Sequence, residues 1–164
     1  MKAIFITTLI LFLQLQLNAQ ESAQNFEGLK QSISKISPEI DLTNKLIFIS
    51  TWKSTDFESR EMNKEAYRVY KIYENARLKN GEKGTVFISL NLDTDDQNRS
   101  LAIGKDGIEQ SVVYSDTQLI TMIQSQFNLS GTQNIIVMDK TGAIQYTNLS
   151  KDQIFPSLRN LITR

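Results

Sequence analysis

Three short runs of apolar, mostly β-branched and aromatic residues constrain the fold of this chain more than any other feature. They lie at residues 45–50, 85–90 and 134–139. Successive apolar positions are typical of strands that are buried on both faces, as in a parallel sheet. Segments with apolar residues at helical spacing separate these runs. Strands that alternate with helices predict an α/β fold with a mostly parallel sheet and right-handed crossovers.

Helical spacing and turn residues predict the remaining elements. The first long helix is expected to begin after Asp56 or Thr55, either of which can cap it, and to stop at Asn80-Gly81. A final helix over 150–163 contains Pro156, which favours a helix start close to that residue. The other expected elements are helices at 97–105 and 117–127, a short strand at 111–114, and a terminal hairpin with its turn at 140–142 and its second strand at 143–147.

The first 19 residues have the pattern of a secretory signal peptide. Lys2 precedes an apolar run at 3–13, and the small residue Ala19 ends the segment. The apolar run is shorter than the ~20 residues that a membrane span needs. We therefore expect cleavage near Ala19 and a periplasmic or secreted mature chain without a stable membrane anchor.

The mature chain divides into two parts in this interpretation. Residues 20–44 form a polar N-terminal segment, with a short helix expected before Ser37-Pro38. Residues 45–164 form one α/β domain that is long enough to bury a core without disulfides.

Two absent residue types exclude several classes of chemistry. The chain contains no Cys and no His. It therefore has no thiol nucleophile, no disulfide, no imidazole base and no ordinary zinc site. Its 18 basic and 18 acidic residues balance, so nothing indicates nucleic-acid binding. No metal site and no cofactor are predicted.

Two acidic clusters carry alternatives of their own. Asp93, Asp95 and Asp96 resemble half of a calcium loop, but the loop's later ligand positions are not filled, and a solvated turn that caps the next helix explains them better. Asp56, Glu58 and Glu61 form the second cluster, near the only Trp. A glycosidase-like pair is the less favoured interpretation there, because acids at a helix start suit its dipole.

Three blocks of sequence resemble the TlpA-like thiol-disulfide oxidoreductase (redoxin) family of exported thioredoxin relatives. The first block, 47–63, contains Trp52, then Asp56-Phe57-Glu58-Ser59, then Arg60-Glu61-Met62. The others are 86–93 and 127–144. The resemblance covers roughly residues 45–164, and it implies a thioredoxin-like fold.

The resemblance also shows what is missing. The family's two catalytic cysteines would lie at Asp56 and Ser59, and its cis-proline at Gln133. Asp56 suits the positive end of a helix dipole as a thiolate does. It cannot form a mixed disulfide, because thiol-disulfide exchange requires sulfur. The chain is therefore interpreted as an inactive homologue with no catalytic residue of its own.

The family holds extended peptides in a groove between two loops, which here are 52–57 and 131–134. The resemblance thus implies a protein or peptide partner in the cell envelope. Trp52 and Phe57 would supply apolar contacts and Gln133 hydrogen bonds, with Asp56 and Thr132 between them. Two alternatives stay open. The chain could serve an accessory role in a redoxin system whose cysteines a partner supplies, or it could keep the fold and use another surface.

Overall fold

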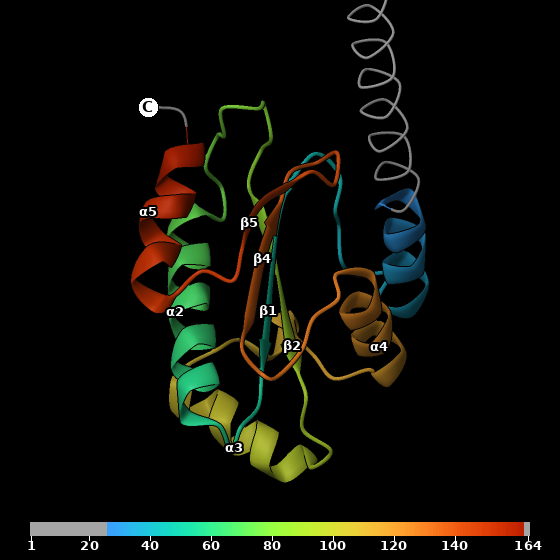
Figure 1. Cartoon of the computed structure of the whole chain (residues 1–164), viewed down its shortest axis with the longest axis vertical. Coiled ribbons are helices and arrows are strands. Elements are labelled where there is room, and N and C mark those ends of the chain that lie inside the picture. The colour runs from blue at the N-terminus through green and yellow to red at the C-terminus, as the bar shows by residue number, and fades with distance from the viewer. Residues whose placement is uncertain (1–25, 163–164) are drawn as a thin grey trace, which may run out of the picture.

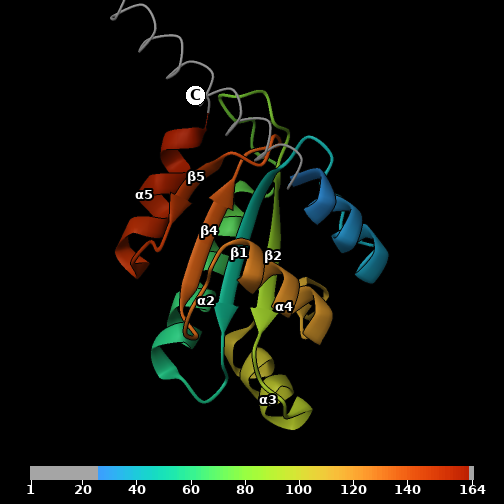
Figure 2. The same cartoon turned by 45° about the vertical axis from the view of Figure 1, so that its right-hand side comes forward.

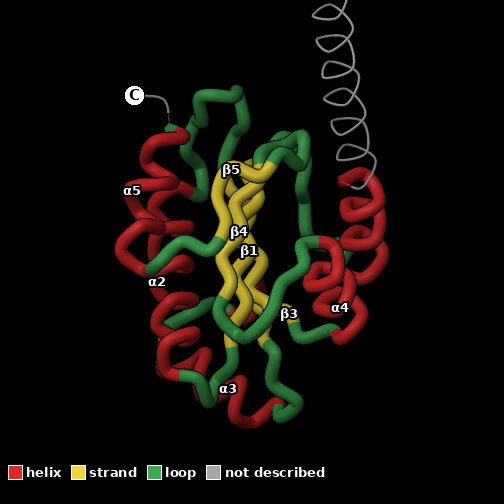
Figure 3. The backbone as a smooth tube through the Cα atoms, in the orientation of Figure 1, coloured by secondary structure: helices red, strands yellow, loops and turns green. Residues whose placement is uncertain are grey.

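The computed structural model describes residues 26–162. The expected signal peptide, its cleavage near Ala19 and residues 20–25 lie outside this range. A central sheet stands between two helical layers, seen almost edge-on in Figure 1. Figure 3 shows the same arrangement, with the strands in the middle and the helices around them.

The order of elements agrees with the order that the sequence predicts. Residues 26–36, before Ser37-Pro38, are helical as expected. The elements that follow are β1 (Leu46–Trp52), α2 (Phe57–Tyr73), β2 (Thr85–Asn91), α3 (Asp96–Asp106), a 3₁₀ turn (Gln110–Val112), β3 (Val113–Tyr114), α4 (Thr117–Gln126), β4 (Asn134–Met138), β5 (Ile144–Thr147) and α5 (Lys151–Leu161).

The sheet has five strands in the order β3-β2-β1-β4-β5. β1 pairs with β2 in parallel, and β2 pairs with β3 in parallel. β4 runs antiparallel to β1, and the β4–β5 hairpin forms one edge. Every residue of β1 and β4 is buried. The predicted mixed sheet flanked by helices is confirmed, with two parallel and two antiparallel strand pairings. Its apolar runs are continuous because helices cover both faces.

Each face of the sheet has its own core. One contains side chains of α2, α3 and α5, which pack on strand residues such as Phe48 of β1 and Phe87 of β2. The centroids of these two rings lie 5.2 Å apart in an edge-on arrangement. The other lies on the opposite face, which α4 and the helix at 26–36 cover (Figures 1 and 2), and it contains side chains of both helices. Five buried residues of this second core precede residue 45, where the domain was expected to start: Phe26, Leu29, Ile33, Ile40 and Leu42. The packed core therefore begins within the expected N-terminal segment.

The turn of the β4–β5 hairpin is in close contact with the helix at 26–36. Gly142 has φ +84°, and a Cβ at this position would overlap the ring of Phe26. Only glycine satisfies both the backbone angle and the approach. The turn thus anchors the helix against the sheet.

The end of α2 differs from the prediction. The helix ends at Tyr73, well before Asn80-Gly81. The chain then turns back on itself, with Arg77 and Lys83 forming an antiparallel bridge. Gly81 has φ +81° near the tip of this turn. The Asn-Gly pair is therefore part of a reversal, which uses the same residues as a helix stop.

The position of α5 agrees with the helix that was predicted over 150–163. The helix begins at Lys151, and Ser150 and Gln153 form a capping box before it. Pro156 lies inside the helix. The capping signal, more than the proline, sets the first residue of the helix.

Candidate functional site

Three loops meet at one end of the sheet. Two of them follow the carboxyl ends of β1 and β2, and the third precedes β4 (Figure 2). Because β4 is antiparallel to β1, its beginning lies beside the end of β1. All the positions that the family motif assigns to chemistry fall in or beside these loops.

Asp56 joins two of the loops. One of its oxygens accepts hydrogen bonds from the backbone N–H groups of Glu58 and Ser59, at 3.1 and 3.2 Å, so it caps α2 as expected. The hydroxyl of Thr132 donates to the other oxygen. The Thr132 bond is the largest cause of a lowered pKa for Asp56, and the Ser59 backbone bond is the next. A carboxylate thus occupies the position of the first cysteine and ties α2 to the β4 loop.

Ser59, at the position of the second cysteine, is completely buried. Its hydroxyl oxygen accepts a hydrogen bond from the N–H of Lys53 at 3.1 Å. The same hydroxyl donates to the carbonyl of Asp56 at 3.1 Å. Ser59 therefore holds the 53–56 loop against the first turn of α2.

Trp52 does not lie at the surface. Its side chain is 0% exposed, in the core between α2 and the sheet. Its indole N–H donates to Ser89 Oγ at 2.8 Å, and Ser89 in turn donates to Asn63 Oδ1 at 2.9 Å. The prediction that Trp52 contacts a ligand is wrong, because the residue closes a strand that is buried on both faces.

Thr51 and Asn134 fix the loop before β4, and the sequence reasoning missed both. The Thr51 hydroxyl accepts hydrogen bonds from the backbone N–H and the side-chain amide of Asn134, at 3.0 and 2.9 Å. It also lies 3.3 Å from the carbonyl of Thr132, to which it donates. Polar residues at the ends of apolar strands were the available signal. No cis peptide bond occurs within residues 26–162.

Phe57 and Gln133, the two remaining predicted site residues, are both exposed. Phe57 is 73% exposed, next to Asp56. Gln133 is also exposed, but it lines a cavity of about 390 Å³ beside β5 to which Asp56, Phe57 and Thr132 do not contribute. The structure therefore brings together Asp56, Phe57 and Thr132, which we call the loop surface. Gln133 belongs to the second feature, which we call the β5 cavity.

The acidic loop after β2 is internally hydrogen-bonded. Asp93 accepts from the N–H of Ser54 at 2.9 Å and from the amide of Asn91 at 2.8 Å. Asp95 caps α3 through the N–H groups of Gln97 and Asn98. Within the described range, no group of three or more potential metal ligands lies close enough to hold an ion. In the structure, Asp95 therefore caps a helix, and Asp93 holds the loop after β2 against the loop after β1.

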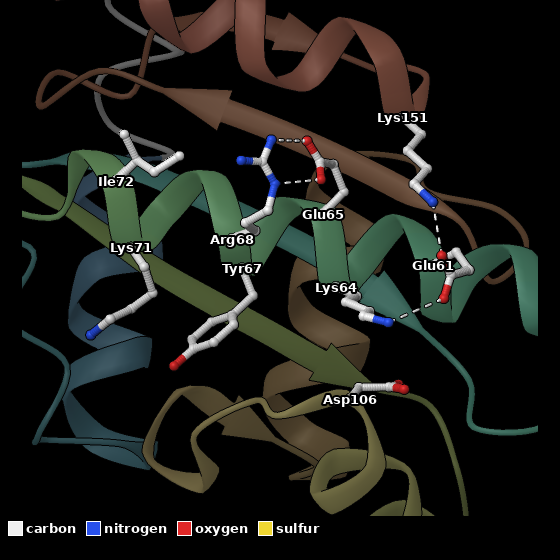
Figure 4. A pocket seen from close by; sticks show the side chains of 9 residues that line it. All are labelled: Glu61, Lys64, Glu65, Tyr67, Arg68, Lys71, Ile72, Asp106 and Lys151. Carbon is white, nitrogen blue, oxygen red and sulfur yellow. Dashed lines mark hydrogen bonds and ion pairs between the residues drawn. The ribbon is translucent and has the colours of Figure 1, made fainter.

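A larger cavity, about 630 Å³, lies on the outer face of α2 between α3 and α5 (Figure 4). Most of its charged side chains pair with one another. Glu61 contacts Lys151 at 2.8 Å and Lys64 at 3.7 Å, and Arg68 contacts Glu65 at 2.6 Å. Lys71 and Asp106, which also line the cavity, pair with Glu74 and Arg60 outside it. The charged side chains of the lining are therefore engaged in ion pairs of the protein itself.

The fold is thioredoxin-like. No protein-family model matches the sequence, and no curated protein sequence matches it. Solved structures do match. The thioredoxin domain of a thiol-disulfide oxidoreductase from Bacteroides vulgatus has a TM-score of 0.60 at 16% identity, over 75% of this chain and 83% of that one.

Two further structures agree with this fold. A thiol:disulfide interchange protein from a Bacteroides species has a TM-score of 0.61 at 16% identity, over 74% of this chain and 76% of that chain. A thiol:disulfide interchange protein of the thioredoxin family from Chlorobium tepidum has a TM-score of 0.57 at 15% identity, over 73% and 81% of the two chains. The predicted fold and its resemblance to thiol-disulfide oxidoreductases are confirmed, and the cysteines of such enzymes are absent from this sequence.

Among the helices that the structure describes, within residues 26–162, none combines the length and the apolar character that crossing a membrane requires.

Proposed function

We propose that this protein is an exported thioredoxin-like protein that has no redox chemistry of its own and binds a protein or peptide partner at the loop surface. One observation carries the proposal. An aromatic side chain, Phe57, stands 73% exposed beside the contact between Asp56 and Thr132. Exposed aromatic residues on an ordered surface are frequent anchors of protein interfaces.

The chemistry of the site favours non-covalent binding. The oxygens at the two cysteine positions are occupied as a helix cap and as a loop tie. Neither a carboxylate nor a hydroxyl can exchange with a disulfide. What the site can offer a partner is its exposed surface and its hydrogen-bonding groups.

The loop surface is held in place before any partner arrives. Ser59 ties the 53–56 loop to α2, Thr51 ties the β4 loop to β1, and Thr132 joins the two loops through Asp56. A surface that is already ordered loses little conformational entropy on binding. This rigidity supports a recognition role for the loops.

Export is proposed from the leader pattern of residues 1–19. A disulfide oxidoreductase from Mycobacterium tuberculosis that shares the fold, with a TM-score of 0.55 at 11% identity, is described as secreted. We place this protein in the periplasm or outside the cell on the same basis. A partner that carries thiol-disulfide cysteines would make this chain an accessory subunit of a redoxin system.

The proposal is tested by affinity capture from envelope extracts with Phe57→Ala. Leu101→Ala is the matched control, because Leu101 is also strongly exposed, at 65%, but lies outside the loop surface. We expect the wild type and Leu101→Ala to retain the same partner, and Phe57→Ala to retain at least ~10-fold less, as expected for the loss of an aromatic anchor. Equal capture by all three proteins would show that Phe57 does not contribute to partner binding.

A further inference from the structure

We propose that the β5 cavity binds an uncharged, extended polypeptide segment of a partner. The inference rests on the proposed function, because it assumes that the partner is a protein or peptide. It adds a second contact region and a chemical preference. The cavity has a volume of about 390 Å³ and lies between the segment that joins α4 to β4 and the outer strand β5.

The lining of the β5 cavity contains no ionisable side chain. The cavity on α2 is the opposite case, because seven of its nine lining residues are charged. A charged ligand group that entered the β5 cavity would lose hydration without meeting a counter-charge. The lining therefore selects neutral ligands.

Exposed side-chain amides make the cavity suited to peptide groups. Asn128, Gln133 and Asn148 are exposed and line it. Within the described part of the chain, their side chains make no hydrogen bond, whereas the amide of Asn134 is occupied by Thr51 and Ser130. A side-chain amide offers donors and an acceptor that match the N–H and C=O of a peptide backbone.

Apolar contacts are available in the same cavity. Ile136 is buried and forms part of the floor, and Ile144 is 51% exposed at the rim. An exposed isoleucine beside unpaired amides is a site for a small or medium apolar side chain between two peptide groups.

The position of β5 favours an extended ligand. β5 is the edge strand, with β4 on one side only. In Figure 2, α4 crosses in front of β1 and β2, whereas no described helix covers β4 and β5 on that side. An extended segment beside an edge strand can use the backbone groups of that strand, while its alternate side chains enter the cavity.

The test starts from random heptapeptides displayed on phage and selected on the protein as it is purified from cells. Binding of the selected peptides, synthesised with blocked termini, is then measured to the wild type, Ile144→Lys and Ile72→Lys. Ile72 is the matched control, because it is an isoleucine of equal exposure, 50%, on α2. We expect peptides without charged residues, with a Kd raised at least ~10-fold by Ile144→Lys and unchanged by Ile72→Lys. If thermal unfolding shows that Ile144→Lys disturbs the fold, Gln133→Lys at an exposed position replaces it.

Other outcomes overturn the inference. Failure to select any peptide, selection of charged peptides, or equal binding to Ile144→Lys and wild type would each do so. Phe57→Ala separates this inference from the proposed function. Binding lost with Phe57→Ala but kept with Ile144→Lys would retain the loop surface and reject the β5 cavity. Binding lost only with Ile144→Lys would support the cavity, and the capture experiment with Phe57→Ala would decide the loop surface separately.

Discussion

At the scale of single residues, Asp56 has a structural role at the start of α2. It caps α2 and binds Thr132, whereas Asp95 caps α3 without a hydroxyl partner from another loop. We expect Asp95→Ala to lower the free energy of unfolding by about 1 kcal/mol, as for a lost cap. Asp56→Ala should lower it by about 2–3 kcal/mol, because the Thr132 contact is lost as well. Urea unfolding at pH 7 measures both, and equal losses would contradict a role for Thr132.

The lowered pKa of Asp56 makes part of the stability depend on pH. Its unfolded pKa is near 3.8 and its folded pKa is lower, so the unfolded chain binds the proton more readily. The stabilisation is present above the unfolded pKa and is lost as pH falls through the folded pKa. We expect Thr132→Val, which removes the hydroxyl, to raise the pKa of Asp56 towards its ordinary value. A carboxyl titration by NMR measures it, and an unchanged pKa would show that the Thr132 bond does not form in solution.

Trp52 gives an optical test of the core. It is the only Trp in the chain, and it is fully buried. We therefore expect its fluorescence to resist iodide quenching in the native protein and to become quenchable in urea. Strong quenching in the native state would place the indole at the surface, where the sequence motif had suggested it.

At the scale of elements, the order and positions of the strands and helices could be predicted, but the residue at which α2 ends could not. Strand positions were predictable because helices bury both faces of the sheet and so leave apolar runs. The end of α2 was not, because Asn80-Gly81 is equally suited to a turn within a longer connection. Burial on both faces also explains Trp52, because such a strand offers no solvent-facing position. Position within a motif does not show which way a side chain points.

Pro156 is the element-scale feature with the clearest consequence for stability. It lies inside α5, and it has no N–H to donate to the preceding turn. We expect Pro156→Ala to raise the free energy of unfolding by about 1–3 kcal/mol, since proline is the least favourable residue inside a helix. Thermal unfolding monitored by circular dichroism measures the change. A lower unfolding temperature for the variant would mean that the proline supports the local packing of α5.

At the scale of the whole molecule, the fold is thioredoxin-like, and the sequence contains no cysteine. The contact between the two loops was not predictable, because it joins residues 76 positions apart in the chain. The β5 cavity was missed for the same reason, since its lining comes from the α4–β4 connection and from β5. Tertiary proximity of this kind leaves little trace in local sequence patterns.

The most direct test of the account is photo-crosslinking in cells from position 57, with position 159 on α5 as the exposed control. Mass spectrometry identifies what each position captures. The account predicts a protein or peptide trapped from position 57 and none from position 159. Crosslinking from position 159 and none from position 57 would contradict the account, because the partner would then bind another face of the protein.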